Sequence, residues 1–303
     1  MGQIFNLQQI INGLQVGSIY ALIALGYTMV YGIVRLINFA HGDFFMIGAY
    51  AAFGAFALFN SWFAKGNTVL AFIVLLCSMA AGGAIALLAN RFAYRPLRYK
   101  PKLSSLITAI GVSMFIEYLF SALPFIGPSY RAFPSLLPKR QIAIGSATIS
   151  NYVIIDIAVA AILMIGLTLL VRKSSLGKAM RAVSQDKDAA RLMGIDVEKV
   201  IAWTFLIGGA FAGAAGLLSG MTYPRIFPYL GILPGLKAFI AAVLGGIGNI
   251  PGAVLGAYIM GLAETFASAY NSLLGEGIAF AILILVLLVR PRGILGEKTA
   301  DKI

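Results

Sequence analysis

The residues that could do chemistry in this 303-residue sequence are few and isolated. It has one histidine, His41, and one cysteine, Cys77, and neither belongs to a cluster with metal-ligand spacing. A nucleophilic hydrolase needs a base beside its nucleophile, whereas a lone histidine more often satisfies a local hydrogen bond. A phosphate-binding loop of the form Gly-x-x-x-x-Gly-Lys-Ser/Thr is absent from the sequence. We therefore expect no enzyme, no metal site and no cofactor bound by this chain.

Polar side chains instead interrupt long apolar runs. One group precedes the apolar stretch 44–59 and consists of Asn38, His41, Gly42 and Asp43. Two acids, Glu117 and Glu264, lie inside other apolar runs. A polar group within a membrane is costly unless it faces a cavity or a polar partner. The first group is therefore a candidate lining of a translocation pathway, and the acids are candidates for an ion or proton path; the alternative is that each acid is neutral or paired in a helix interior.

A second unusual feature is a glycine-rich interruption of the apolar sequence near the carboxyl end. The short run 238–244 stops and resumes at 253–270, and between them stand Gly245, Gly246, Gly248 and Asn249. Glycine and proline free backbone groups that need protein or water around them, so we expect a broken membrane helix that lines the pathway. Close packing of helices is the alternative.

The longest polar interruption covers residues 172–199. Ser184 is placed to cap a short helix, Asp186 and Asp188 fall in its first turn, and Gly194 stands where a left-handed stop is expected. These signals predict a helix over roughly 185–193. Its small and apolar residues among charges suit docking into a groove of a partner protein. The candidate docking residues are Arg181, Ser184, Asp186, Asp188, Ala189, Ala190, Arg191, Leu192 and Gly194.

The composition defines the class of fold that must position these residues. The chain is 60% hydrophobic and 11% charged, with a mean hydropathy of +0.91, whereas a soluble domain is about 25% charged. We predict an all-α polytopic membrane protein that forms one transmembrane domain, 1–303, with a cytoplasmic loop at 172–199. The net charge of +12 does not indicate nucleic-acid binding, because the basic residues stand between apolar runs.

The basic residues also predict the orientation. Most Lys and Arg residues fall in the segments 91–102, 172–199 and 290–303, so these segments should be cytoplasmic, the carboxyl terminus included. About eight transmembrane helices with one or two broken or re-entrant segments are expected. If 36–59 re-enters, the count is eight and the chain starts inside, which we favour; if it crosses, the count is nine and the chain starts outside.

Four segments carry a resemblance that runs from end to end of the chain: GYTMVYG with LINFAHGD at 26–32 and 36–43, GKAMRAVSQDKDAARLMGID at 177–196, AVLGGIGNIPGA at 242–253 and RPRGILG at 290–296. Together they resemble the LivH-type permease subunits of branched-chain amino acid ABC importers. In that family a cytosolic helix couples the permease to an ATPase subunit, and here it would fall on 181–195.

The resemblance implies alternating access in the bacterial inner membrane. The implied partners are two ATP-binding subunits that use ATP and Mg, a second related permease, and a periplasmic or lipoprotein solute-binding protein that delivers leucine, isoleucine or valine. Related permeases for urea, amides or another small solute share this architecture. The alternative from a different class is an ATPase-independent secondary transporter, in which the broken helices and the acids Glu117 and Glu264 would do the work.

Overall fold

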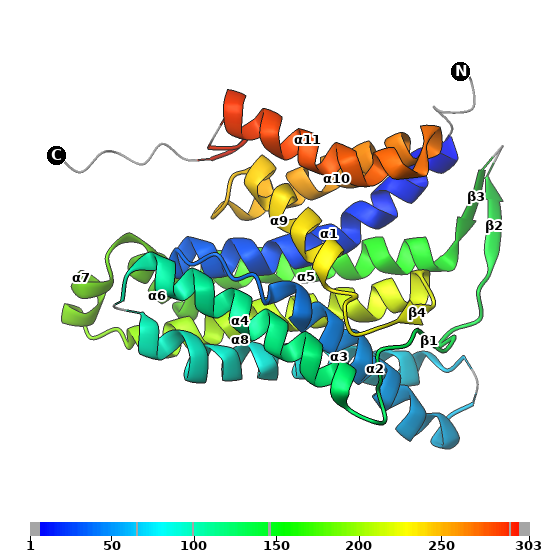
Figure 1. The fold of residues 1–303 in the computed structure, drawn as a ribbon, viewed down its shortest axis with the longest axis horizontal. Helices are drawn as coiled ribbons and strands as arrows, with labels where there is room; N and C mark the ends of the chain where they lie inside the picture. The colour runs from blue at the N-terminus through cyan, green and yellow to red at the C-terminus, as the bar shows by residue number, and fades with distance from the viewer. Residues whose placement is uncertain (1–6, 65, 99, 145–146, 291, 297–303) are drawn as a thin grey trace.

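The computed structural model describes residues 7–64, 66–98, 100–144, 147–290 and 292–296. Helices form most of it (Figure 1): α1 Leu7–Val34, α2 His41–Phe59, α3 Thr68–Ala89, α4 Lys102–Ala122, α5 Asn151–Lys173, α6 Ser175–Gln185, α7 Lys187–Leu192, α8 Val197–Thr222, α9 Ile232–Gly245, α10 Ile250–Tyr270 and α11 Ser272–Val289. The strands are β1 Arg131–Ala132, β2 Gln141–Ile144, β3 Ala147–Ser150 and β4 Arg225–Ile226. Strands β1 and β4 pair antiparallel, as do β2 and β3.

The prediction of an all-α polytopic membrane protein is confirmed. Within the described ranges, eight helices are long and apolar enough to cross a membrane, and α9 is a shorter apolar helix. Helix α1 has 28 residues, and at 1.5 Å per residue it exceeds the hydrocarbon thickness of a bilayer, about 30 Å. Strands β1, β2 and β3 lie between α4 and α5, and β4 follows α8.

Small residues let the central helices α2, α3 and α8 approach closely. A Cβ atom at Gly213 of α8 would overlap the backbone of Ser78 in α3, and one at Gly48 of α2 would overlap Gly213. The Ser78 hydroxyl donates to the carbonyl oxygens of Gly48, at 3.0 Å, and of Gly213, at 2.5 Å. In a lipid environment helices associate by such close packing and by interhelical hydrogen bonds, because lipid is as apolar as their side chains.

The two ends of the bundle differ (Figure 1). Helices α6 and α7 form one end, and the hairpin β2–β3 lies at the other. The backbone N–H of Thr148 in β3 donates to Oε1 of Gln8 in α1 at 2.8 Å, so α1 begins at the hairpin end. The favoured topology, with the start on the side of the 172–199 loop, is therefore wrong.

The reason lies in residues 35–62. Residues 35–38 after α1 have no regular structure, α2 begins only at His41, and the 3-10 turn Asn60–Trp62 completes the passage to the hairpin end. The segment crosses the bundle rather than re-entering. This is the alternative with nine membrane segments, which are the eight long helices and the shorter α9.

The predicted break between residues 245 and 252 is also present, although it is shorter than expected. Helix α9 ends at Gly245 and α10 starts at Ile250. Gly246 and Gly248 have positive φ angles of 105° and 98°, which glycine adopts without steric cost. Asn249 caps α10 by accepting a hydrogen bond from the N–H of Gly252 at 2.9 Å, and Pro251 occupies the first turn, where proline is tolerated.

Candidate functional site

The polar loop between α5 and α8 contains two helices rather than the single helix expected over 185–193. Ser174 caps α6 by accepting from the N–H of Gly177 at 2.9 Å. Asp186 caps α7 by accepting from the N–H groups of Asp188 and Ala189 at 2.9 and 3.0 Å. The expectation that Ser184 is the cap is wrong: its hydroxyl donates to the carbonyl oxygen of Arg181 within α6, at 2.7 Å. Asp186 is extended, with φ at −152°, and its ionised carboxylate suits the positive helix start.

The apolar patch expected on this loop is only partly available to a partner. Leu192 and Met193 are 89% and 82% exposed, and Ala189 is also exposed. Ala190 is only 4% exposed and packs within the chain, so it does not belong to a docking face. Gly194 ends the segment with φ at +81°, as its position predicted. The large exposed apolar side chains of this segment are therefore Leu192 and Met193, at the carboxyl-terminal end of α7.

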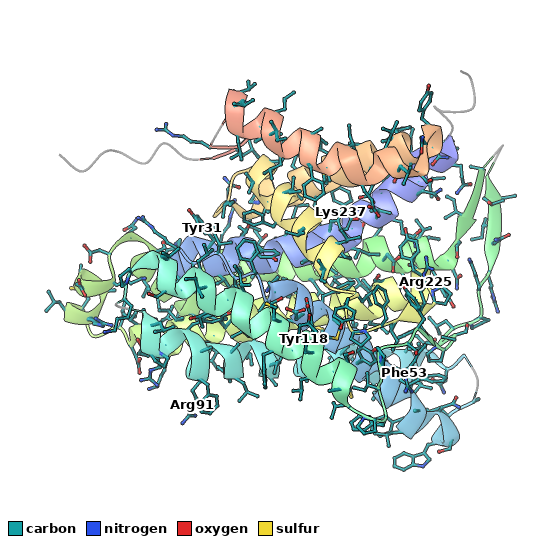
Figure 2. All side chains as sticks on the ribbon, viewed as in Figure 1. Tyr31, Phe53, Arg91, Tyr118, Arg225 and Lys237 are labelled. Atoms are coloured by element: carbon teal, nitrogen blue, oxygen red, sulfur yellow. The ribbon has the colours of Figure 1, made fainter. Side chains whose placement is uncertain are left out.

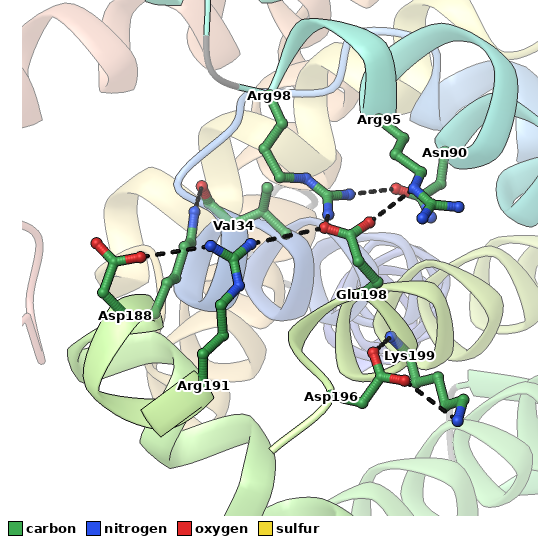
Figure 3. Close-up of polar contacts among 10 residues, drawn as sticks. Val34, Asn90, Arg95, Arg98, Asp188, Arg191, Asp196, Glu198 and Lys199 are labelled. Carbon is green, nitrogen blue, oxygen red and sulfur yellow. Dashed lines mark hydrogen bonds and ion pairs between the residues drawn. The ribbon is translucent and has the colours of Figure 1, made fainter. Parts of the chain in front are cut away.

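Glu198, in the first turn of α8, ties this loop to the end of α3 (Figure 3). Its carboxylate accepts from Arg98 and from Nε of Arg95 at 3.0 Å, and it lies 4.0 Å from a guanidinium nitrogen of Arg191. Arg191 in turn pairs with Asp188 at 3.4 Å. The side chain of Arg98 is only 6% exposed. One carboxylate thus joins three cations from two separate segments and fixes where α7 sits.

Lys187 joins the same loop to the end of α1. Its Nζ donates to the carbonyl oxygen of Val34 at 3.3 Å, and the bond is drawn in Figure 3. Partial burial lowers the pKa of Lys187, and the nearby cations Arg98, Arg35 and Arg191 lower it further. Several cations therefore lie close together at this end of the bundle. The Glu198 carboxylate offsets part of the repulsion between them.

The polar group expected on the pathway is divided between a loop and a helix. Asn38 precedes α2, and its Oδ1 accepts from the hydroxyl of Tyr94 at 2.5 Å. His41 is 1% exposed, and its ring lies 4.6 Å from the ring of Tyr27. Asn38 and His41 therefore do not share a helical face. Both contribute to the buried packing around the start of α2.

Gly42 and Asp43 reach a cavity that also holds one of the predicted acids. The cavity has a volume of about 220 Å³, and its lining includes Gly42, Asp43, Ser113 and Glu117. Asp43 is 2% exposed, and its Oδ2 has no hydrogen-bond partner in the described part of the chain. The Ser113 hydroxyl lies 3.5 Å from Oε1 of Glu117. The fold thus brings together two carboxyl groups that lie far apart in the sequence.

The glycine-rich break lies elsewhere. A Cβ atom at Gly245 would overlap Gly252, and one at Gly246 would overlap Gly296. Asn249 Nδ2 donates to the carbonyl oxygen of Leu295 at 3.0 Å. None of these residues lines the Asp43 cavity. Their close backbone contacts agree with the alternative prediction, in which the glycines serve close packing of helices. Gly248 alone reaches a cavity, of about 100 Å³, which Arg181 and Ser184 of α6 also line.

Glu264 in α10 is paired rather than free. Lys237 in α9, labelled in Figure 2, donates to its Oε1 at 2.6 Å, and the Tyr20 hydroxyl of α1 donates to its Oε2 at 2.8 Å. The side chains of Lys237 and Glu264 are 8% and 17% exposed. A single cation at the start of an apolar run, as Lys237 is, indicates that the residue needs a partner within the bundle.

A further buried acid was missed. Asp156 in α5 is fully buried, and its Oδ2 accepts from Nε2 of Gln15 at 2.7 Å and from the hydroxyl of Thr222 at 2.9 Å. It lies inside the apolar run 150–171 and was recognisable by the argument applied to Glu117. Across the described ranges, no group of three or more His, Cys, Asp or Glu side chains could hold a metal ion.

The fold and these sites define a polytopic α-helical membrane protein with a polar cavity among its helices and a helical loop at one end, which is the architecture of a permease. Residues 9–287 match the family model described as "Branched-chain amino acid transport system / permease component". The chain therefore belongs to this family of permease components.

Relatives with assigned names agree with this placement. The permease protein BraD of the high-affinity branched-chain amino acid transport system of Pseudomonas aeruginosa is 44% identical over 302 residues, 98% of each chain. LivH of Escherichia coli is 43% identical over 306 residues, covering 99% of this chain and 98% of LivH. LivM of Escherichia coli is 27% identical over 307 residues, covering 91% of this chain and 68% of LivM.

Proposed function

We propose that this chain is the multi-pass permease subunit of an ATP-driven importer that carries leucine, isoleucine and valine across the inner membrane. The observation that carries the proposal is the helical loop α6–α7, which projects at one end of the bundle with Leu192 and Met193 exposed. A secondary transporter has no need of such a surface, whereas a permease that takes its energy from another chain must present one.

The partner surface would be the tip of α7 on the cytoplasmic side. Leu192 and Met193 would enter a groove of an ATP-binding subunit, with Ala189, Asp188 and Arg191 at its rim. Arg181, Ser184 and Asp186 would act indirectly, because they build and cap the two helices, and Ala190 and Gly194 would hold α7 in place. ATP and Mg would bind the partner subunits, since the present sequence has no phosphate-binding loop.

The other partners would be a second, related permease and a solute-binding protein on the hairpin side. The carboxyl terminus would be cytoplasmic, because α11 runs toward the end that carries α6 and α7. The pathway would include Gly42 and Asp43, which face the cavity, with Asn38 and His41 supporting the start of α2. Gly245, Gly246 and Asn249 would serve as packing residues, and Gly248 would lie nearer the α6 end.

The test is purification of the native complex from membranes, followed by mass spectrometry of its subunits and leucine uptake in proteoliposomes. We expect two ATPases and a second permease to co-purify, and uptake to require ATP inside the vesicles. An ATPase-independent transporter would purify without nucleotide-binding partners and would accumulate solute on an ion gradient alone. Competition by urea, amides and other small solutes against labelled leucine would reveal a different substrate.

A further inference from the structure

The cavity that holds Asp43 has the size of a small organic solute. Its volume of about 220 Å³ corresponds to roughly seven waters at about 30 Å³ each. It lies among α2, α4 and α9 and opens between the last two, where Ile110 and Ile232 on its rim are 44% and 42% exposed. A bare ion would leave most of this space empty, and a peptide would not fit.

One wall of the cavity is acidic. Asp43 from α2 and Glu117 from α4 both line it, and the Asp43 carboxyl group also interacts with Ser113 and Glu117. Asp43 Oδ2 is buried without a hydrogen-bond partner among the described residues. Buried polar groups of native proteins nearly always have a partner, so an unpartnered carboxylate oxygen on a residue that lines a cavity points to a ligand that donates hydrogen bonds.

A second wall is formed by the starts of two helices. α2 begins at His41 and α9 at Ile232, and Gly42 and Gly231 approach so closely that a Cβ atom on either would overlap the backbone of the other. Neither start has a side-chain cap in the described structure. By contrast, α3, α5, α8, α10 and α11 are all capped by a side chain, and α4, which also lacks a cap, begins at the loop end of the bundle after Pro101.

Two uncapped helix starts at one place favour a negative group. At these two starts the N–H groups of His41, Asp43 and Ile232 already donate to carbonyl oxygens of the preceding turns, so what the starts offer a ligand is the positive end of each helix dipole. Broken membrane helices use such ends to bind carboxylates. The rest of the lining is apolar and includes Phe39, Met114 and Leu236. The cavity therefore combines an acidic wall, a wall of helix starts and an apolar wall.

We propose that this cavity is a transient binding site, within the permease itself, for a zwitterionic α-amino acid with an aliphatic side chain. Its ammonium group would lie between Asp43 and Glu117, its carboxylate at the starts of α2 and α9, and its side chain against Met114 and Leu236. The proposal rests on the proposed import of branched-chain amino acids and adds that the solute is recognised a second time inside the membrane. A metal cation alone would leave the helix starts unused, and an anion alone would meet the two carboxyl groups.

The test measures binding of tritiated leucine to the complete permease–ATPase complex in nanodiscs, without its solute-binding protein, by scintillation proximity. Saturable binding is expected. Leucine amide, which lacks the carboxylate, and 4-methylpentanoate, which lacks the ammonium group, should each compete at least about tenfold more weakly than leucine, because each loses one charge-assisted interaction. Sodium chloride in excess should not displace leucine. Equal competition by either analogue, or displacement by sodium, would overturn the assignment, and this comparison needs no variant.

Variants locate the site. Asp43→Asn and Glu117→Gln should each weaken leucine binding about ten- to hundredfold, whereas Glu276→Gln, an exposed acid on α11, should leave it unchanged. Membrane abundance and co-purification of the ATPases report whether each variant folds. Should Asp43→Asn fail to assemble, Met114→Trp, which fills the cavity from the more exposed α4, should abolish binding instead.

The two proposals fail in different ways. If the wild-type complex imports leucine in proteoliposomes but shows no saturable binding, or if both carboxyl variants bind as the wild type does, the cavity site is wrong and the import function stands. If the wild-type complex with its binding protein does not import leucine, the proposed function itself is wrong.

Discussion

Glu198 provides the sharpest test of how the α7 surface is held. Its carboxylate contacts Arg98, whose side chain is 6% exposed, and Arg95, whose side chain is 57% exposed. A hydrogen bond to a charged group contributes about 1.5 to 3 kcal/mol when buried, whereas an exposed ion pair contributes about 0 to 1 kcal/mol. The Arg98 contact should therefore dominate, and Glu198→Ala should destabilise the fold by about 2 to 3 kcal/mol. Glu198→Gln keeps an acceptor and should cost about half of that.

The functional consequence follows from the position of Glu198. It is the acidic residue that three cations of this end share, so its loss leaves α7 without its link to the end of α3. We expect Glu198→Ala to reduce leucine uptake more than it reduces ATP hydrolysis, because α7 would no longer transmit motion from the ATPase to the bundle.

The measurements are thermal unfolding of the detergent-solubilised complex by intrinsic fluorescence, together with uptake and ATPase rates in proteoliposomes. Lys199→Gln is the matched control, because Lys199 pairs with Asp196 at 3.1 Å in an exposed contact, with its side chain 79% exposed. It should change stability by less than about 1 kcal/mol. If Glu198→Ala and Lys199→Gln melt together and transport equally well, the argument from burial is refuted.

Three further predictions use the same assays and membrane abundance. Leu192→Asp should abolish co-purification of the ATPases and leave the chain in the membrane, because an 89% exposed side chain contributes nothing to folding; normal assembly would exclude the tip of α7 as the partner surface. A cysteine that replaces Leu7 should react with an impermeant thiol reagent only from the outside, and one that replaces Ser184 only from the inside. Labelling of both cysteines from the same side of the membrane would contradict the fold. Gly213→Ala should cost about 1 to 3 kcal/mol by overpacking, whereas Gly111→Ala, with open space around its Cβ position, should cost nothing; equal abundance of the two variants would disprove the close contact of α3 and α8.

The long apolar helices were predictable from the sequence because each is a local property. A run of about 20 apolar residues must satisfy its own backbone hydrogen bonds in lipid, and only a helix does so within one segment. The caps at Asp196 and Asn249 and the stop at Gly194 also depend on neighbouring residues alone. Of these, Gly194 was anticipated from residue type and position.

What the sequence did not reveal depends on contacts between distant segments. The choice between Ser184 and Asp186 as a cap was decided by how far α6 extends, and α6 extends because Met180 and Val183 are buried against the rest of the chain. The pairing of Lys237 with Glu264 joins α9 to α10. The sequence around either residue does not indicate which residue is its partner. The burial of Ala190 likewise depends on packing within the fold, which the capping residues of α7 do not indicate.

The distribution of buried acids separates structural from functional roles. Glu264 is paired with the Lys237 cation and accepts from Tyr20. Asp156 accepts from Gln15 and Thr222 through Oδ2, while its Oδ1 has no partner among the described residues. Both acids therefore fasten α1 to its neighbours. Asp43 lines a cavity, and one of its carboxylate oxygens has no hydrogen-bond partner among the described residues. Glu117 lies beside it and is 3.5 Å from the Ser113 hydroxyl. A carboxyl group that already has donors gains little from a ligand, whereas one that faces a solute-sized space gains a great deal. The Asp43–Glu117 pair is therefore where a passing solute with donor groups would be retained, and the other two acids keep the surrounding helices fixed while it passes.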